Sequence, residues 1–405
     1  MKKFLEIGLG IVTGVGGFLD IGSITTAAQA GALYGFQLAW AIVLGALCII
    51  FLAEQSGRLA AISHRTITDA IRERFGSNYF IVLFGVLGVV MLLVLGAELG
   101  GVCIAVEFMT GIDYRWWAVP VALVGWLTIW FGNFAVIEEG VAALGLVTIS
   151  FAVVAVMLHP DWIDVAKGLL PTTPDHDSAR YWFLASNILG ASITPYLMFF
   201  YSSGAIEDRW DRSHLVMNRI IASLGMGLGA FISVAVLVVA AQVLAPRGIA
   251  VDHYAQLGLL MTDALGAAGF WILAVSIAIP CFSTALEVAL SVAYMAAQGF
   301  GWNGSQNGRP KDNARFCTTY TGAIVIGVLL LLAGVSPVRL TNIAMALTSA
   351  TLPVAVLPFL FIMNDRSYMK DQRNGWLSNA VVLFTMALAC VLAVVTIPLE
   401  ISSGG

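Results

Sequence analysis

The stretch Gly14-Val15-Gly16-Gly17-Phe18-Leu19-Asp20-Ile21-Gly22-Ser23 interrupts an apolar run that covers residues 5–35. Glycine is unfavourable in a helix interior, and a carboxylate at membrane depth costs about 2.5–3.5 kcal/mol on insertion scales. We therefore expect a helix that is broken near Asp20, with the carboxylate facing a partner, a cavity or a bound ion. The simpler alternative is a single Asp whose oxygens are satisfied by a neighbouring hydroxyl.

The composition indicates where such an apolar run resides. Apolar residues make up 59% of the 405 residues and charged residues only 11%, against about 25% charged residues in soluble domains. A bilayer can bury this much apolar surface, whereas a soluble fold of this length cannot. The formal net charge of −4 gives no reason to expect nucleic acid as a partner. The five cysteines lack paired spacing, so neither a disulfide framework nor a zinc site is expected.

The chain divides into apolar segments long enough to cross a bilayer, which takes roughly 20 mostly apolar residues. We expect an all-α membrane protein with about eleven transmembrane helices in a single domain. The expected spans are 5–35, 38–56, 79–110, 116–132, 134–158, 182–206, 216–245, 267–298, 316–334, 338–363 and 377–398.

The positive charges support this count. With the N-terminus in the cytoplasm, five of the 20 Lys and Arg residues fall in external connections, which leaves 20 − 5 = 15 inside. The external five are Arg115, Lys167, Arg180, Arg247 and Arg339. Cytoplasmic connections of membrane proteins carry the excess of Lys and Arg. The sequence therefore predicts a multi-pass protein of the cell membrane, with a cytoplasmic N-terminus and an external C-terminus.

A second interruption lies in the sixth span, at Gly190-Ala191-Ser192-Ile193-Thr194-Pro195-Tyr196. Pro195 lacks an amide donor and clashes with the carbonyl of Ala191, so the unwound carbonyls of 191–194 need a partner. Breaks in spans one and six are expected of a transporter with two five-helix inverted repeats, in which both breaks form the substrate site. A proline kink without any site is the alternative.

This LeuT-like (APC-type) arrangement assigns the first repeat to about 5–158 and the second to about 182–363, with an extra helix at about 377–398. Among the connections, the apolar spacing of 66–75 predicts an amphipathic cytoplasmic helix. We expect 159–181 to be an external loop and 301–313 a flexible link.

The residues at both breaks resemble the Nramp family of divalent-metal transporters. The first helix of that family carries Asp-Pro-Gly-Asn followed by Gln-Ala-Gly-Ala, and this chain has Asp20-Ile21-Gly22-Ser23 followed by Gln29-Ala30-Gly31-Ala32. Thr194-Pro195-Tyr196 occupies the place of the family's Met-Pro-His. Weaker similarity runs in order through most of the chain. The resemblance implies a metal site made by Asp20, Ser23, Ile193 and Thr194.

The departures from the family pattern alter the expected ligands. Ser23 stands for the family's Asn and Thr194 for its Met. A thioether favours softer metals, whereas carboxylate, hydroxyl, carbonyl and water oxygens suit magnesium, calcium and manganese. Ser and Thr are also shorter than Asn and Met, so the site should be wider. A wider site suits magnesium, because magnesium usually keeps several waters when bound. The chain therefore resembles the Nramp-related magnesium transporters more than the iron and manganese carriers, and manganese remains an alternative.

Proton coupling by the family's usual route is not expected. Tyr196 stands where the resemblance places a His, and Leu95 where it places an Asp, so groups that titrate near neutral pH are lost. Glu98 is kept, and it could pair with Arg315 as a relic of a proton path or accept hydrogen bonds from helix-packing hydroxyls. Glu287 could line the aqueous pathway or be a protonated group inside the bundle.

Other functions are less consistent with the sequence. An amino-acid or organic-amine carrier could use the same broken-helix fold, although Asp20 would repel a substrate carboxylate. An enzyme should show clustered His, Asp or Cys at membrane depth, and a sensor a soluble output domain; the chain has neither. We expect no enzyme activity and no cofactor, only Mg²⁺ or Mn²⁺ as transported substrate.

Overall fold

The computed structural model describes residues 2–132, 145–174, 176–308 and 310–403, and these are helical without any β-strand. The α-helices are α1 (Lys2–Phe18), α2 (Ile21–Tyr34), α3 (Ala39–Ser63), α4 (Ile67–Thr110), α5 (Tyr114–Phe131), α7 (Ile149–Met157), α8 (Trp162–Lys167), α9 (Ser178–Ser192), α10 (Pro195–Glu207), α11 (Leu215–Val243), α12 (Leu259–Phe300), α13 (Ala314–Leu332), α14 (Pro337–Ile362), α15 (Arg366–Met369) and α16 (Trp376–Ser403). Short 3₁₀ turns lie at Gly145–Thr148, Arg212–His214, Ala245–Arg247 and Tyr254–Gly258.

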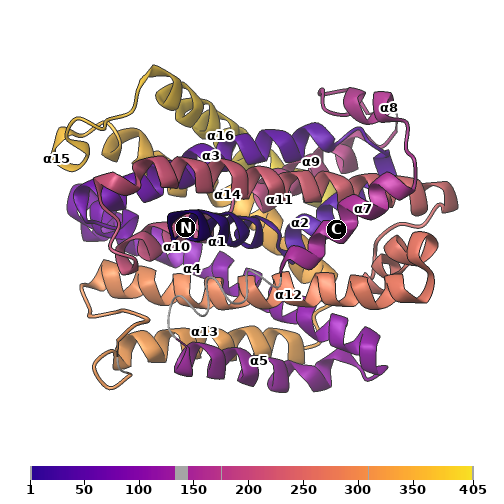
Figure 1. Ribbon diagram of the computed structural model, residues 1–405, viewed down its shortest axis with the longest axis horizontal. Coiled ribbons are helices and arrows are strands. Elements are labelled where there is room, and N and C mark those ends of the chain that lie inside the picture. The colour runs from indigo at the N-terminus through magenta and orange to yellow at the C-terminus, as the bar shows by residue number, and fades with distance from the viewer. Residues whose placement is uncertain (1, 133–144, 175, 309, 404–405) are drawn as a thin grey trace.

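The helices run in roughly one direction and form a bundle around α1, α2, α9 and α10. Figure 1 shows the long helices α11 and α12 on either side of α1, with α5 and α13 along one edge and α3 and α16 along the other. Among the contacts between helices, α4 packs on α12 and α14, whereas α11 packs on α1, α2 and α3. The two broken spans are therefore enclosed by the other helices, and the window of α9–α10 that is apolar enough to span a membrane is entirely buried.

Both predicted helix breaks are present. The helices α1 and α2 form a pair bent by 60°, and α9 and α10 are separated by two non-helical residues. By length and composition, eight helices in the described ranges can cross a membrane, or nine if the bent pair counts as one span. The first part of the expected span 134–158 lies outside the described residues. The all-α, broken-helix fold class is confirmed, whereas the count of eleven stays a prediction.

The connections differ in part from expectation. The segment before Gly76 is helical, and Gly76 itself, with φ of 84°, separates this short helix from the long span that follows. Only glycine adopts such a φ at little cost, which explains the sharp junction. The expected loop 159–181 contains the short helix α8. The link 301–313 is anchored, because Ser305, Gln306 and Asn307 donate hydrogen bonds to Glu207 at the end of α10.

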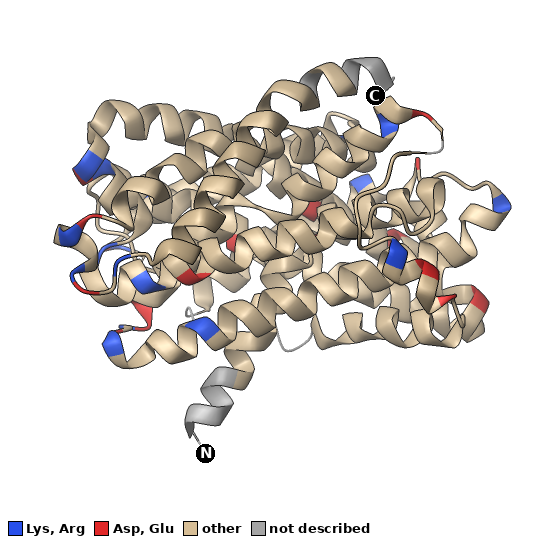
Figure 2. Cartoon of the chain, turned by 90° about the horizontal axis from the view of Figure 1, so that it is seen from above, with Lys and Arg blue, Asp and Glu red and all other residues tan. Residues whose placement is uncertain are grey.

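The charged residues gather at the two ends of the bundle. One end, here called the arginine-rich end, holds the connections 64–66, 208–214 and 363–375, which ion pairs such as Arg74–Asp365 and Arg212–Asp371 join. The opposite end holds α8 and the segment 244–258. Figure 2 shows most Lys and Arg positions at the ends of the bundle and acidic positions in its interior. The interior acids are the feature that a purely structural bundle does not require.

Candidate functional site

The first break places a carboxylate at the start of α2. Asp20 is the N-cap of this helix and fully buried; its Oδ1 accepts a hydrogen bond from the Ser23 amide at 2.6 Å. The Ser23 hydroxyl in turn accepts from the Asp20 amide at 3.0 Å and donates to the Asp20 carbonyl at 2.9 Å. This capping box fixes the carboxylate where the amide dipoles of α2 favour negative charge. It also leaves one lone pair on the Ser23 hydroxyl for a further partner.

The second break exposes backbone carbonyls. The helix α9 ends at Ser192, and α10 begins at Pro195, whose ring is suited to the first helical position. Ile193 and Thr194 between them are buried. No donor in the described part of the chain forms a hydrogen bond to the carbonyls of residues 191–194. Since buried carbonyls are nearly always paired, four in succession without a donor form a strongly electronegative strip.

Tyr196 connects the two breaks. Its hydroxyl lies 3.3 Å from the carbonyl oxygen of Gly17 and 3.4 Å from Oδ2 of Asp20, and it can donate to either. The Tyr196 carbonyl accepts a hydrogen bond from Ser291 of α12 at 3.3 Å. Thr194 is buried at the same break, two residues before Tyr196. The structure therefore brings Asp20, Thr194 and Tyr196 together.

Glu98 supports the first break from α4. The Ile21 amide lies 3.2 and 3.3 Å from the two carboxylate oxygens of Glu98, which is fully buried. Glu98 therefore binds a free amide at the start of α2, which neither sequence-based alternative anticipated. Arg315 lies elsewhere, at the start of α13, where its guanidinium is 5.4 Å from the centre of the Trp302 ring. The structure does not bring Glu98 and Arg315 together.

One residue near the site escaped the sequence reasoning. A Cβ built on Gly22 would stand 2.6 Å from Sδ of Met345, on α14, and 3.2 Å from Oδ1 of Asp20. The absence of a side chain at Gly22 thus lets a buried thioether approach the carboxylate. Met345 belongs to an otherwise ordinary apolar helix, so the sequence contains no signal for this contact.

The buried acids lack cationic partners. Asp20, Glu98 and Glu287 are 0%, 0% and 3% exposed, and among the residues that the structure describes none of the three forms an ion pair. The described residues also contain no group of three or more His, Cys, Asp or Glu side chains able to hold a metal ion. A cation at this place would therefore be bound by one carboxylate together with hydroxyl and backbone oxygens.

A cavity of about 300 Å³ opens toward the arginine-rich end and reaches into the bundle as far as Glu287. Small residues at one face of α1, Gly10, Thr13 and Gly14, form part of its wall. These residues recur every three to four positions, so they share one face of the helix. Asp20 is not among the lining residues, so the cavity ends below the break.

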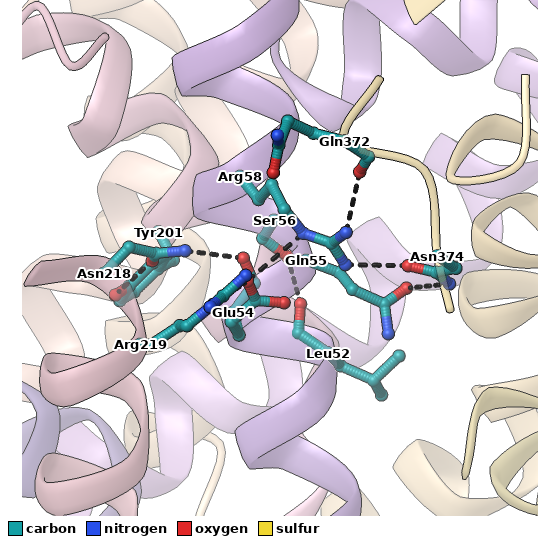
Figure 3. A network of polar contacts seen from close by, with 10 residues as sticks. All are labelled: Leu52, Glu54, Gln55, Ser56, Arg58, Tyr201, Asn218, Arg219, Gln372 and Asn374. Carbon is teal, nitrogen blue, oxygen red and sulfur yellow. Dashed lines mark hydrogen bonds and ion pairs between the residues drawn. The ribbon is translucent and has the colours of Figure 1, made fainter. Parts of the chain in front are cut away.

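A polar network lies next to this cavity at the arginine-rich end, and its member Tyr201 lines the cavity wall (Figure 3). Arg58 of α3 pairs with Glu54 at 3.1 Å and donates to the Gln372 carbonyl and to Asn374 at 2.8 and 2.7 Å. Asn218 donates to the Glu54 carbonyl, and Tyr201 donates to Asn218. The network thus joins α3, α10, α11 and the segment before α16.

A fixed negative charge lies beside His214, one of the residues that line the cavity. Asp211 accepts hydrogen bonds from the hydroxyl and amide of Ser213, and these lower its pKa to about 2. Asp211 also contacts the ring of His214, which lines the cavity. This carboxylate is consequently ionised throughout the physiological pH range.

Comparison with known proteins identifies the family. The model of the "Natural resistance-associated macrophage protein-like" (Nramp) family matches residues 10–398. The chain belongs to the Nramp family. Nramp proteins are transporters, so this one is a multi-pass membrane transporter and not an enzyme.

Individual relatives agree with this assignment. A divalent metal cation transporter MntH of Caldanaerobacter subterraneus is 24% identical over 99% of this chain and 96% of its own length. The manganese transporter of Eremococcus coleocola superimposes with a TM-score of 0.81 at 18% identity, covering 98% of this chain and 86% of that one. The nucleobase-cation-symport-1 transporter Mhp1 superimposes with a TM-score of 0.64 at 14% identity over 97% of this chain and 92% of that one. The LeuT-like fold is thus shared beyond the family.

Proposed function

We propose that this Nramp protein carries divalent metal cations, magnesium or manganese, by alternating access, with the cation bound between the two helix breaks. The observation that carries the proposal is the run of donor-free carbonyls at 191–194, in a break that the Tyr196 hydroxyl links to the carboxylate of Asp20. Asp20, Ser23, the carbonyl of Ile193 and the hydroxyl of Thr194 would provide the oxygen ligands. Relatives are named as transporters of divalent metal cations or of manganese, which agrees with this cargo.

The electrostatics of the breaks favour a cation. The helices α1 and α9 both end at the breaks, and the carboxyl end of a helix carries partial negative charge. The amino ends of α2 and α10 carry partial positive charge, but Asp20 and Glu98 both lie against the start of α2 and offset it. A carboxylate with several neutral oxygens is a ligand set that Mg²⁺ and Mn²⁺ accept.

Met345 changes the expected selectivity. The ligands inferred from the sequence were all oxygens, whereas the thioether of Met345 lies near Asp20. Because sulfur favours softer metals, Met345 supports manganese at least as strongly as the oxygen ligands support magnesium. A bulky organic amine is less consistent with the structure, because Asp20 is fully buried and the cavity ends at Glu287.

We further propose that transport does not require proton coupling. The phenol of Tyr196 carries no titrating charge near neutral pH, and Leu95 has no titratable group. Glu98 is engaged by the Ile21 amide at the start of α2 and forms no ion pair with any described residue. A membrane potential that is negative inside would then be sufficient to drive cations inward.

The proposed orientation puts the arginine-rich end in the cytoplasm. This assignment follows from the excess of Lys and Arg at that end. It makes the cavity a passage toward the cytoplasm.

Uptake into proteoliposomes tests the proposed function. Purified protein should take up Mg²⁺ and Mn²⁺, with each cation and Cd²⁺ competing, and an inside-negative potential should accelerate uptake. A trapped pH-sensitive dye should report no acidification that depends on metal. Failure of both metals to enter would refute the assignment of cargo, and acidification in proportion to metal entry would refute the uncoupled mechanism.

A further inference from the structure

The cavity at the arginine-rich end has an acidic lining. Asp208 and Glu287 are among the lining residues, with His214, and the described residues contribute no Lys or Arg to the wall. A narrow cleft lined by one sign of charge concentrates the opposite ion. The arginines of this end lie outside the cavity, in the connections and in the network around Arg58.

Glu287 is the least compensated of the buried acids. It lies on α12, and only one described donor, the Ser283 hydroxyl at 3.3 Å, forms a hydrogen bond to it. Asp20 and Glu98, in contrast, each accept from a backbone amide. A carboxylate that is 97% buried, by its 3% exposure, and has one weak donor and no cationic partner is costly in its ionised form, and either a proton or a bound cation removes that cost.

The carboxyl end of α1 lies directly beside Glu287. A Cβ built on Gly17 would stand 3.5 Å from Oε2 of Glu287, so this oxygen is close to the α1 backbone. The carbonyls of Gly16 and Phe18 accept no hydrogen bond from any described residue. A helix end with free carbonyls adds negative potential at the place where Oε2 lies.

We propose that Glu287 and the free carbonyls at the end of α1 form a second cation site, at the inner end of the cavity. The site takes a divalent cation with some of its waters, which the cavity can hold, and it receives the ion from Asp20 before release. Gly17 lies between the two sites, since the Tyr196 hydroxyl that contacts Asp20 also contacts the Gly17 carbonyl. This inference rests on the proposed function and adds a release step to it.

Cation binding to the purified full-length protein tests the second site. Isothermal titration with Mn²⁺ should show that Asp20→Ala retains saturable binding, and that adding Glu287→Gln to Asp20→Ala removes it. Glu287→Gln keeps the shape of the side chain and a hydrogen bond with Ser283 while removing the charge. Glu287→Asp in the Asp20→Ala background should retain part of the binding, because it keeps a carboxylate on α12.

A side-specific measurement shows the role in release. In proteoliposomes, Glu287→Gln should weaken inhibition by Mn²⁺ added at the arginine-rich end by about tenfold or more, because the cavity no longer concentrates cations. The apparent KM for Mn²⁺ from the opposite end should stay unchanged. Glu107→Gln is the matched control, since Glu107 is an acid near the other end of the bundle, held by the Tyr114 amide.

The outcomes separate the two proposals. If Asp20→Ala abolishes both uptake and all Mn²⁺ binding while Glu287→Gln behaves as wild type, the second site is wrong and the proposed function stands. If neither variant changes binding or uptake of the metals, the proposed function itself fails. If Glu287→Gln and Glu107→Gln had equal effects, Glu287 would act only through the net charge of the protein. The second cation site would then be wrong.

Discussion

The two helix breaks at the centre of the protein are held in different ways. At the first, side chains satisfy the helix end, because Asp20 and Ser23 form a capping box and Glu98 binds the Ile21 amide. At the second, Pro195 starts α10 without a side-chain cap, and the carbonyls of 191–194 are left without donors. The first break therefore contributes fixed charge and the second contributes neutral oxygens. Charge attracts every divalent cation, whereas the neutral ligands determine which cation fits best.

The largest effect is expected at the first break. Asp20→Ala should reduce uptake of Mg²⁺ and Mn²⁺ to the level of empty liposomes, because it removes the one carboxylate at the proposed site. Asp20→Asn should do the same while keeping an acceptor for the Ser23 amide, which makes it the control for folding. Radiotracer or fluorescence uptake measures both variants. Undiminished uptake by either would show that the first break does not provide the charge.

Substitutions at the second break should change the selectivity between metals more than the rate of uptake. Thr194→Met adds a thioether, so the ratio of Cd²⁺ to Mg²⁺ affinity should rise by about tenfold, equivalent to about 1.4 kcal/mol. Thr194→Val, which has no sulfur, is the matched control. Competition of Cd²⁺ and Mg²⁺ against Mn²⁺ uptake gives the ratio. A uniform loss for all three metals would contradict the distinction between the breaks.

Met345→Leu tests the thioether that is already present. If the sulfur contributes to binding, the variant should favour Mg²⁺ over Mn²⁺ by several-fold, since leucine has a similar volume but no donor. The same competition assay measures the change. An unchanged ratio of Mn²⁺ to Mg²⁺ affinity in this variant would mean that Met345 only fills space against Gly22.

A smaller effect is expected from the contact between the breaks. Tyr196→Phe removes a hydroxyl whose distances to Gly17 and Asp20 are 3.3 and 3.4 Å, which are long for an O–H donor. We expect a change in apparent KM of a few-fold, with the pH dependence of uptake unaltered because the phenol carries no titrating charge near neutrality. A lost pH dependence would indicate that Tyr196 takes part in proton movement.

The smallest expected effect concerns the capping box. Ser23→Ala removes the hydroxyl that binds the Asp20 backbone and should lower the free energy of unfolding by about 1 kcal/mol. Thermal unfolding in detergent measures this, with Thr26→Ala as control, since the Thr26 hydroxyl only bonds the Gly22 carbonyl one turn back. If Ser23→Ala lost uptake as completely as Asp20→Ala, the Ser23 hydroxyl would be an essential cation ligand and not mainly a stabiliser of the helix break.

Several features could be inferred from the sequence because they depend on neighbouring residues. Hydropathy over about 20 residues identifies a spanning helix whatever its partners. The breaks at Asp20 and Pro195 follow from glycine, proline and carboxylate chemistry within a few residues. The short helix before Gly76 follows from local periodicity. These properties concern the backbone and its transfer into lipid, and a residue's neighbours in sequence suffice to determine them.

Other features were decided by helix packing. Glu98 meets the Ile21 amide across 77 residues of sequence, in place of the arginine suggested by charge alone. The Met345 thioether lies against Gly22, next to Asp20, because α14 packs on α2 at a glycine. The cavity that ends at Glu287 is lined by residues of α1, α10, α11 and α12, which are far apart in the sequence. The sequence by itself determined the fold class, the breaks and the carboxylate, whereas tertiary structure decided which oxygens and sulfur surround them, because such distances depend on how distant helices cross.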